Sequence, residues 1–343
     1  MTGDDRYDLG HHGDREVAPG LLDLAVNVRN DAPPLWLRGR LERALDKLGA
    51  YPDQTKGIQA VARRHGRDPD EVLLTAGGAE AFVLLARALS PSYALCVHPS
   101  FTEPEAALRA AGHEVHRHVL DPPYVLGDVP EQADLVVVGN PTNPTGVLHE
   151  GLERLARPGR VLVVDEAFAD AVPGEPASLA GRSDVEGLVV VRSLTKTWAL
   201  AGLRVGYLLA TPDLVARLRA AQPLWALSTL ALTALETCLA RGPVAAAAKE
   251  AQALAAERER LAAALTGLGV EVSPGSQAPF LLCRVPGRPA VREELRTLGI
   301  AVRRGDTFPG LTPEHWRTAV RDADTSDRLV EALASVLAAP SSP

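Results

Sequence analysis

The chain has 343 residues and a formal net charge of −7, and 46% of its residues are hydrophobic. This length allows a large core and more than one lobe, and acidic charge spread along the chain argues against a nucleic-acid-binding surface. No apolar run approaches transmembrane length, and the acidic start MTGDDRYDLGHHGDREV lacks a signal-peptide pattern, so we expect a cytoplasmic protein. Isolated cysteines predict buried, reduced thiols at Cys96, Cys238 and Cys283.

The first predicted element is an N-terminal arm, residues 1–33, which has few periodic apolar positions. We expect this arm to fold against the smaller of two domains. After Pro33-Pro34, four leucines recur at helical spacing and predict a helix with one apolar face. These leucines are Leu37, Leu41, Leu45 and Leu48.

Short runs rich in valine and leucine then alternate with helical stretches at Ala79–Leu89 and Thr102–Ala111. The predicted strands are Val72–Thr75, Ala94–Val97, Leu135–Gly139, Val161–Val164, Leu188–Val191 and Val205–Ala210. Runs without polar alternation suit strands that are buried on both faces. We therefore predict an α/β large domain over residues 34–222, in which helices flank a mostly parallel sheet.

The residue composition of the sequence changes near Pro223. A long helical region rich in alanine and leucine covers Leu224–Leu268. Shorter segments follow at Phe280–Val285 and Ala301–Arg303, with a helix at Ser326–Leu337. We predict that residues 223–343 form a smaller α+β domain.

Unusual residues gather where the predicted strands end, which is where open α/β sheets bind ligands. Four such loops are TAGGAEA after Leu74, NPTNPTG after Val138, DEAF after Val164 and SLTKTWALAGLRVG after Arg192. TAGGAEA opens a helix with glycines, so the N–H groups of Gly78 and Ala79 are placed to bind a phosphate. The loop lacks the GxGxxG pattern and an acidic ribose partner, which makes a dinucleotide site the weaker interpretation.

Lys196 follows the buried-strand pattern LVVVRSLTK, where a charged amine is costly to desolvate. Desolvation lowers the pKa of an amine and frees it as a nucleophile, whereas the plainer alternative is a lysine that reaches solvent from a loop. Ser193 and Arg204 supply a hydroxyl and a guanidinium that can hold a phosphate. Gly202 and Gly206 allow the backbone to turn closely around it.

The segment SLTKTWALAGLRVGY resembles the cofactor-lysine motif of the class I/II aminotransferases, a superfamily of pyridoxal-phosphate (PLP) enzymes of fold type I. The resemblance runs from about Leu24 to Leu337 and implies that Lys196 is the Schiff-base lysine and catalytic. Asp165, at the end of VLVVD, would keep the pyridine nitrogen of PLP protonated and share the catalytic role. Asn143 would donate to the phenolic oxygen. Taken alone, both side chains are also common in turns.

The same resemblance assigns further positions. Phe101 in HPSF matches the aromatic that stacks on the PLP ring, although a lone aromatic is usually a core residue. Tyr51 in YPD matches a tyrosine that reaches the PLP phosphate of the partner subunit, which implies a homodimer with shared active sites. Arg317 in WRTAVR matches the arginine that binds the substrate carboxylate. Phe168 in DEAF replaces a tyrosine that usually bonds the phenolic oxygen, which leaves that role to Asn143.

Two groups within the superfamily are closest: histidinol-phosphate aminotransferase and the threonine-phosphate decarboxylase of cobalamin biosynthesis. GHHGD, HPSFTEPEAAL, DEAF and FPGL…WRTAVR are more similar to the decarboxylase, so we favour that reaction and keep the aminotransferase as the alternative. Both relatives take phosphorylated substrates, and Arg303 matches their phosphate-binding position, with Arg304 beside it as a helper. A third hypothesis is a non-catalytic PLP-fold protein, which the complete set of cofactor residues argues against.

The stretch HEVHRH places His116 and His118 on one face of a predicted edge strand, just after His113. No set of carboxylates or cysteines lies nearby in the sequence. We therefore interpret these side chains as exposed histidines and predict no metal site.

Overall fold

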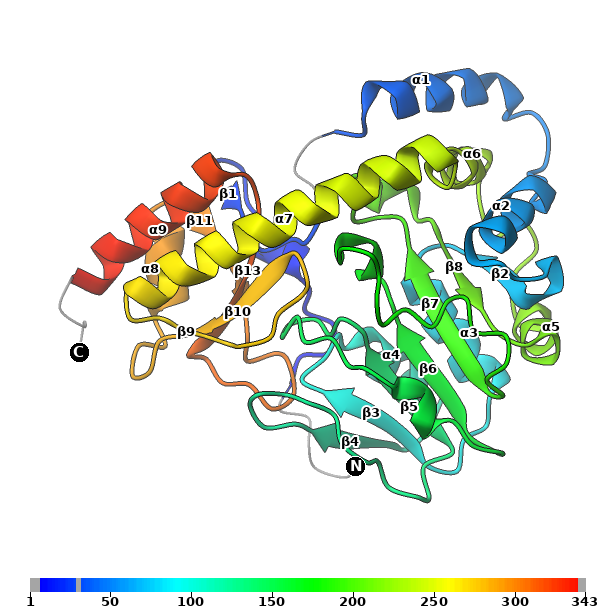
Figure 1. Ribbon diagram of the computed structural model, residues 1–343, viewed down its shortest axis with the longest axis horizontal. Coiled ribbons are helices and arrows are strands. Elements are labelled where there is room, and N and C mark those ends of the chain that lie inside the picture. Colours follow the sequence, from blue (N-terminus) through cyan, green and yellow to red (C-terminus); the bar gives the residue numbers. More distant parts are fainter. Residues whose placement is uncertain (1–6, 29–31, 339–343) are drawn as a thin grey trace.

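The computed structural model describes residues 7–28 and 32–338, which form two groups of secondary structure (Figure 1). The strands of the larger group are β2 (Val72–Thr75), β3 (Ala94–His98), β4 (Val115–Val119), β5 (Leu135–Gly139), β6 (Val161–Asp165), β7 (Leu188–Ser193) and β8 (Gly206–Leu209). Within the described residues they form a seven-stranded sheet in the order β2-β8-β7-β6-β5-β3-β4. The strands from β7 to β4 run parallel, and only β8 pairs antiparallel with its neighbours, so the sheet is mostly parallel, as predicted.

Helices cover both faces of this sheet, because its strands are apolar on both sides. The helices packed on one face are α3 (Gly78–Ala88), α4 (Glu103–Ala110) and α5 (Pro212–Ala220). The helices on the other face are α1 (Leu35–Ala44), α2 (Thr55–His65) and α6 (Thr229–Cys238). All three cysteines are buried, as predicted.

The smaller group lies beside the sheet and has its own apolar core (Figure 1). Its strands are β9 (Glu271–Val272), β10 (Phe280–Arg284), β12 (Arg303–Arg304) and β13 (His315–Ala319), which pair in the order β12-β13-β10-β9. Its helices are α8 (Val291–Thr297) and α9 (Ala323–Ala338). The N-terminal arm contributes β1 (Leu22–Asp23), which pairs with β11 (Ile300–Ala301) in this group.

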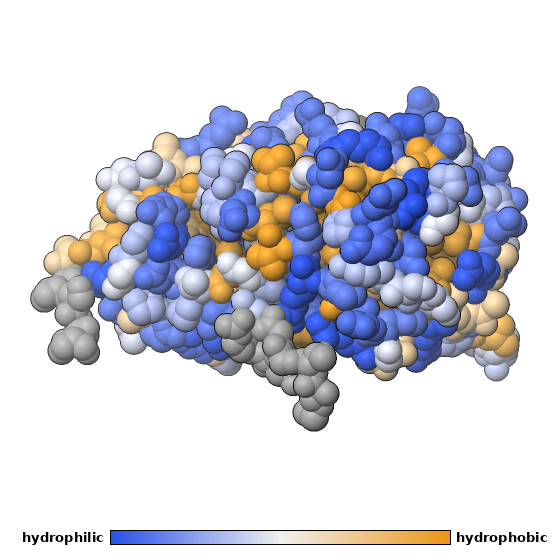
Figure 2. All heavy atoms as spheres, turned by 90° about the horizontal axis from the view of Figure 1, so that it is seen from below, coloured by the Kyte–Doolittle hydropathy of each residue, from blue (hydrophilic) through white to orange (hydrophobic). Residues whose placement is uncertain are grey.

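Short 3₁₀ helices complete the described part of the chain. They are η1 (Gly13–Glu16), η2 (Leu45–Lys47), η3 (Pro69–Glu71), η4 (Leu152–Leu155), η5 (Ala169–Ala171) and η6 (Ala201–Leu203). No helix of the described residues is both long and apolar enough to cross a bilayer. Figure 2 shows a face of the molecule on which hydrophilic residues predominate and hydrophobic residues form smaller groups between them.

Two local predictions need correction. The helical region predicted over Leu224–Leu268 begins later, at Thr229, and consists of two helices: α6, which ends at Cys238, and α7 (Arg241–Gly267), the long helix between the two groups (Figure 1). The predicted leucine stripe also divides: Leu37 is buried in α1, whereas Leu45 and Leu48 are about half exposed beyond the end of that helix. A change from α to 3₁₀ winding at Leu45 moves the later leucines off the buried face.

Candidate active site

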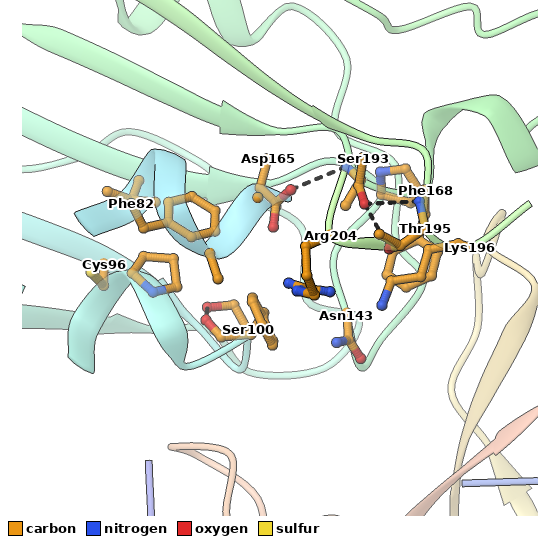
Figure 3. Close-up of a pocket in the computed structure, with 18 residues that line it drawn as sticks. Phe82, Cys96, Ser100, Asn143, Asp165, Phe168, Ser193, Thr195, Lys196 and Arg204 are labelled. Atoms are coloured by element: carbon orange, nitrogen blue, oxygen red, sulfur yellow. Dashed lines mark hydrogen bonds between the residues drawn. The ribbon is translucent and has the colours of Figure 1, made fainter. Parts of the chain in front are cut away.

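A cavity of about 850 Å³, counted to its open mouth, lies at the carboxyl ends of β5, β6 and β7 (Figure 3). Eight of the residues predicted to bind the cofactor line it: Gly78, Ala79, Phe101, Asn143, Asp165, Ser193, Lys196 and Arg204. The structure therefore brings together side chains that span more than a hundred positions of the sequence.

Asp165 and Lys196 stand at the ends of neighbouring strands in this cavity. Burial raises the pKa of Asp165 to about 6, against the opposing effects of the Ala167 N–H and of Lys196. Burial lowers the pKa of Lys196 to about 8, with help from the charges of Arg317 and Arg204. A carboxylate and an amine with pKa values moved toward neutrality are typical of a reactive site.

The segment at the start of α3 forms a cradle on one side of the cavity. Gly77 caps α3 without a side chain and has a φ of +78°, so the first N–H groups of the helix stay open. A Cβ on Gly77 would lie 2.8 Å from Nη2 of Arg204. Open helix N–H groups, a guanidinium and the hydroxyl of Ser193 together suit a phosphate group, so the residues present fit PLP.

Sequence reasoning missed Thr195 on this same side of the cavity. Its Oγ1 lies 2.8 Å from Oγ of Ser193, and both residues line the cavity. The signal was present, because SLTK carries two hydroxyls before the lysine, those of Ser193 and Thr195. The reasoning on glycines holds for Gly206, whose Cβ would meet the Arg192 carbonyl at 2.6 Å, but Gly202 has no neighbour within 4 Å.

Arg317 approaches the cavity from the smaller group of strands. Its Nη1 donates to Oδ1 of Asn143 at 2.6 Å, and its Nη2 donates to the Ala25 carbonyl. When the side-chain amide of Asn27 is oriented so that its oxygen faces Arg317, this oxygen lies 3.1 Å from Nη1 and 3.3 Å from Nε of Arg317. Asn143 thus accepts from Arg317, so its Nδ2 is the end that remains to donate. Asn27 was not predicted, since nothing in the sequence around it points to Arg317.

Arg317 is buried, at 4% exposure, and makes no ion pair with any acid in the described part of the chain. Burial lowers its pKa far below the usual value, and the neighbouring charge of Arg303 adds to the effect. A buried cation with only neutral partners is costly unless an anion joins it. The site around Arg317 therefore suits a carboxylate or another small anion.

Arg303 lies directly opposite Arg317 in the register of β12 and β13 and is equally buried. Its guanidinium donates to the carbonyls of Arg304 and His11 at 2.9 and 2.7 Å and to Oγ1 of Thr307 at 2.6 Å. Glu16 comes within 3.7 Å, yet burial still lowers the pKa of Arg303 to about 10. Arg304 instead turns to Asp306 in a two-point ion pair, so its own charge is already neutralised.

Of two other predicted residues, Phe168 also lines the cavity, whereas Tyr51 lies outside it. Phe168 is buried with its ring edge-to-face on Phe280, 5.0 Å between centroids, and Nζ of Lys196 lies 5.8 Å from the centroid of the Phe168 ring. The phenyl ring offers no hydroxyl to the cavity. Tyr51 does not line the cavity of its own chain: it is 76% exposed and stacks on Trp225.

The histidines of HEVHRH lie on and before β4, the edge strand that was predicted. His113 bonds the Ala86 carbonyl through Nε2, and His116 stacks on Tyr93. Among the described residues, no group of three His, Cys, Asp or Glu side chains is placed to hold a metal.

Comparison with known proteins agrees with this geometry. A family model described as aminotransferase class I and II matches residues 20–334. The chain belongs to that family. A histidinol-phosphate aminotransferase of Mycobacterium tuberculosis (strain H37Rv) is 55% identical over 318 residues, 91% of this chain and 86% of that protein. The threonine-phosphate decarboxylase of Salmonella typhimurium is 32% identical over 335 residues, 92% of this chain and 91% of the other.

The fold also matches that of solved members. The structure of a histidinol-phosphate aminotransferase from Clostridium acetobutylicum superposes with a TM-score of 0.84 at 24% identity, covering 92% of this chain and 99% of the other. The predicted family and the PLP fold type I are therefore confirmed. The chain is a PLP-dependent enzyme.

Proposed function

We propose that this chain is an aminotransferase for a phosphorylated amine, with histidinol phosphate as the first substrate to test. The observation that carries the proposal is the pair of buried arginines, Arg303 and Arg317, opposite each other across β12 and β13. Among the described residues one carboxylate, that of Glu16, lies within ion-pair distance of these two cations, and it also pairs with Arg292, which leaves positive charge for a substrate with more than one negative charge. The relative at 55% identity, which is named a histidinol-phosphate aminotransferase, supports transamination over the decarboxylation that the motifs favoured.

The cofactor residues divide into two sets by chemistry. Gly78, Ala79, Ser193 and Arg204 would hold the phosphate of PLP, with Thr195 as an added hydroxyl beside Ser193. Phe101 would stack on the ring, and Nδ2 of Asn143 would donate to the phenolic oxygen. Bound PLP supplies an electron sink for the bonds at the substrate α-carbon.

Lys196 and Asp165 would carry the chemistry. With a pKa near 8, Lys196 holds a useful fraction of free amine at neutral pH, both to bind the cofactor and to move a proton at the substrate α-carbon. Asp165, with a pKa near 6, is ionised at neutral pH and would keep the pyridine nitrogen protonated.

Arg317 and Arg303 would bind the two anionic ends of the substrate. Arg317 is held by amide and carbonyl oxygens, so its charge is available to a carboxylate or an equivalent group beside Lys196. Arg303 would bind the phosphate at the other end. Arg304 would add little, since Asp306 already holds it.

Decarboxylation of threonine phosphate is the second candidate. Phe168 supports it, because DEAF rather than DEAY is a feature shared with the decarboxylase, and so does the 32% identity to a threonine-phosphate decarboxylase. In that reaction Lys196 would mainly anchor the cofactor and assist release of the product.

The assembly and domain limits belong to the same proposal. Residues 34–222 would be the cofactor-binding domain, 223–343 the smaller domain, and 1–33 an arm on the latter, through the pairing of β1 with β11. Tyr51 is exposed and absent from its own cavity, which supports a homodimer in which it reaches the partner's cofactor.

One assay separates the two reactions. Purified protein loaded with PLP is given L-histidinol phosphate with 2-oxoglutarate in one arm, and L-threonine phosphate without a keto acid in the other. We expect glutamate in the first arm and no CO₂ in the second. CO₂ release without a keto acid, with no glutamate in the first arm, would assign the decarboxylase and reject the aminotransferase.

A further inference from the structure

A buried chain of hydrogen bonds ends on the cofactor cavity outside the residues assigned above. Glu105, in the first turn of α4, lies 2.9 Å from Nε2 of His98 at the end of β3, and both side chains are fully buried. Nδ1 of His98 lies 3.4 Å from Oγ of Ser100. Ser100 lines the cavity immediately before Phe101 (Figure 3). The chain thus links a buried acid to the cavity wall.

The acid of this chain is ionised. Arg109 reaches Glu105 through Nε at 2.7 Å, and Arg117 reaches it through Nε at 2.9 and 3.0 Å and through Nη2 at 2.8 Å. Burial pushes the pKa of Glu105 upward, but hydrogen bonds from His98 and the two arginines outweigh it and set the pKa at about 2. Glu105 is therefore only an acceptor toward His98.

The state of the histidine follows from its surroundings. Burial lowers the pKa of His98, and the two arginines beyond Glu105 lower it further, although Glu105 itself opposes them. The ring is then neutral with one N–H, which Glu105 draws to Nε2. Nδ1 is left as an acceptor that faces Ser100, so the Ser100 hydroxyl has two acceptors at 3.4 Å, Nδ1 of His98 and the Phe101 carbonyl.

We infer that His98 and Ser100 are positioning residues of the cofactor site, in which the Glu105–His98 pair orients the Ser100 hydroxyl and holds the loop that carries Phe101. The inference rests on the placement of PLP proposed above. Ser100 presents its hydroxyl on the cavity wall beside Nδ1 of His98 and the Phe101 carbonyl, and Phe101 follows it directly in the chain. Glu105 of α4 contacts His98 at the start of this loop, and Arg117 of β4 in turn contacts Glu105, so β3, α4 and β4 are joined beside the loop.

A purely structural role for the network makes a different prediction. The ion pairs of Glu105 join α4 to β4 whatever the cavity contains, and their loss would destabilise the fold. Ser100 adds nothing to those ion pairs and is the only member that lines the cavity among the described residues. Removing its hydroxyl therefore tests the link to the cofactor without breaking the network.

The experiment compares Ser100→Ala with Ser100→Thr and with Thr102→Val in PLP-loaded protein. Thr102 is a matched control, because its hydroxyl bonds the Leu9 carbonyl from the same loop and takes no part in the chain to Glu105. The readouts are the dissociation constant for PLP, the pH midpoint of the visible band of the bound cofactor, and the melting temperature. We expect Ser100→Ala to weaken PLP binding about two- to tenfold and to shift the midpoint, as loss of one hydrogen bond predicts, at unchanged melting temperature.

Ser100→Thr should restore both readouts, and Thr102→Val should leave both at the wild-type values. His98→Gln should reproduce the shift of Ser100→Ala with a lower melting temperature. Wild-type values for Ser100→Ala, or an equal shift in Thr102→Val, would overturn the inference alone. A wild-type protein without a visible PLP band, or a Lys196→Ala variant that keeps it, would overturn the proposed cofactor site and this inference with it.

Discussion

The two walls of the active site are built in different ways. The cofactor wall comes from loops at the ends of neighbouring parallel strands, and it holds Lys196, Asp165 and the cradle at Gly77 and Gly78. The proposed substrate wall comes from the smaller group of strands and the N-terminal arm, where Arg317 on β13 contacts Asn143 of the cavity and Arg303 on β12 lies opposite Arg317. The order of the strands in the sheet brings the residues of the cofactor wall together. The residues of the substrate wall come together only when β12, β13 and the N-terminal arm pack against one another.

The charge on each wall differs accordingly. On the cofactor wall an acid and a base share the cavity, and burial moves both pKa values toward neutrality. On the substrate wall two arginines have one nearby carboxylate between them, and burial lowers both of their pKa values. The shifted pKa values on the cofactor wall suit proton transfer near neutral pH. The excess positive charge on the substrate wall suits an anionic substrate.

The largest effect is expected when Lys196 on the cofactor wall is replaced. Lys196→Ala should abolish the visible cofactor band and lower kcat by about 10⁴-fold, because the wall then lacks its amine for binding and for proton transfer. Absorption spectra and steady-state rates measure this. Lys249→Ala, on the exposed side of α7, is the control and should change neither. A persistent band in Lys196→Ala would remove the difference between the two walls.

The second-largest effect is expected when Arg317 on the substrate wall is replaced. Arg317→Ala should lower kcat/KM by roughly 10²- to 10³-fold, as expected for removal of a buried charge that pairs with a ligand, while the cofactor band stays. Arg284→Ala is the control, because the Arg284 guanidinium pairs with Glu314, just before the adjoining strand β13. Loss of the band in Arg317→Ala would show that the two walls are not separable.

A smaller effect should appear at the far end of the same wall. Arg303→Ala should raise KM for the phosphorylated substrate about ten- to a hundredfold, the cost of charge-assisted hydrogen bonds, and spare substrates without a phosphate. Arg304→Ala should have little effect, because Asp306 already neutralises that guanidinium. Kinetics with phosphorylated and unphosphorylated substrate pairs measure the contrast, and an equal loss on both would contradict the assigned role.

The smallest effect concerns pH on the cofactor wall. Only the unprotonated Lys196 amine captures PLP, so the rate of uptake should rise about tenfold per unit as pH increases toward 8 and then level off. Stopped-flow absorbance at a series of pH values measures this profile. A profile that keeps rising to pH 10 would mean that burial does not lower the pKa of Lys196.

Much of the cofactor wall was predictable from the sequence. Valine-rich runs marked the strands, and motifs marked the residues at their carboxyl ends, since parallel strands bring those ends to one edge of a sheet. Thr195 was not predicted although it stands beside Lys196, because the motif assigned a role only to the hydroxyl of Ser193. Asn27 and the Glu105–His98–Ser100 chain were not predictable, because each depends on contacts between elements distant in the sequence.

The sequence by itself determined the fold class, the order of the strands along the chain and the chemistry of the loops that follow them. These depend on local patterns: apolar periodicity, glycines at a helix start, and one lysine after a buried strand. Only the tertiary structure decided that Arg303 and Arg317 are opposed and buried, and that Tyr51 lies outside its own cavity. Burial and partner charge are properties of the packed molecule, and they set the pKa values and the unpaired charge on which the proposed function depends.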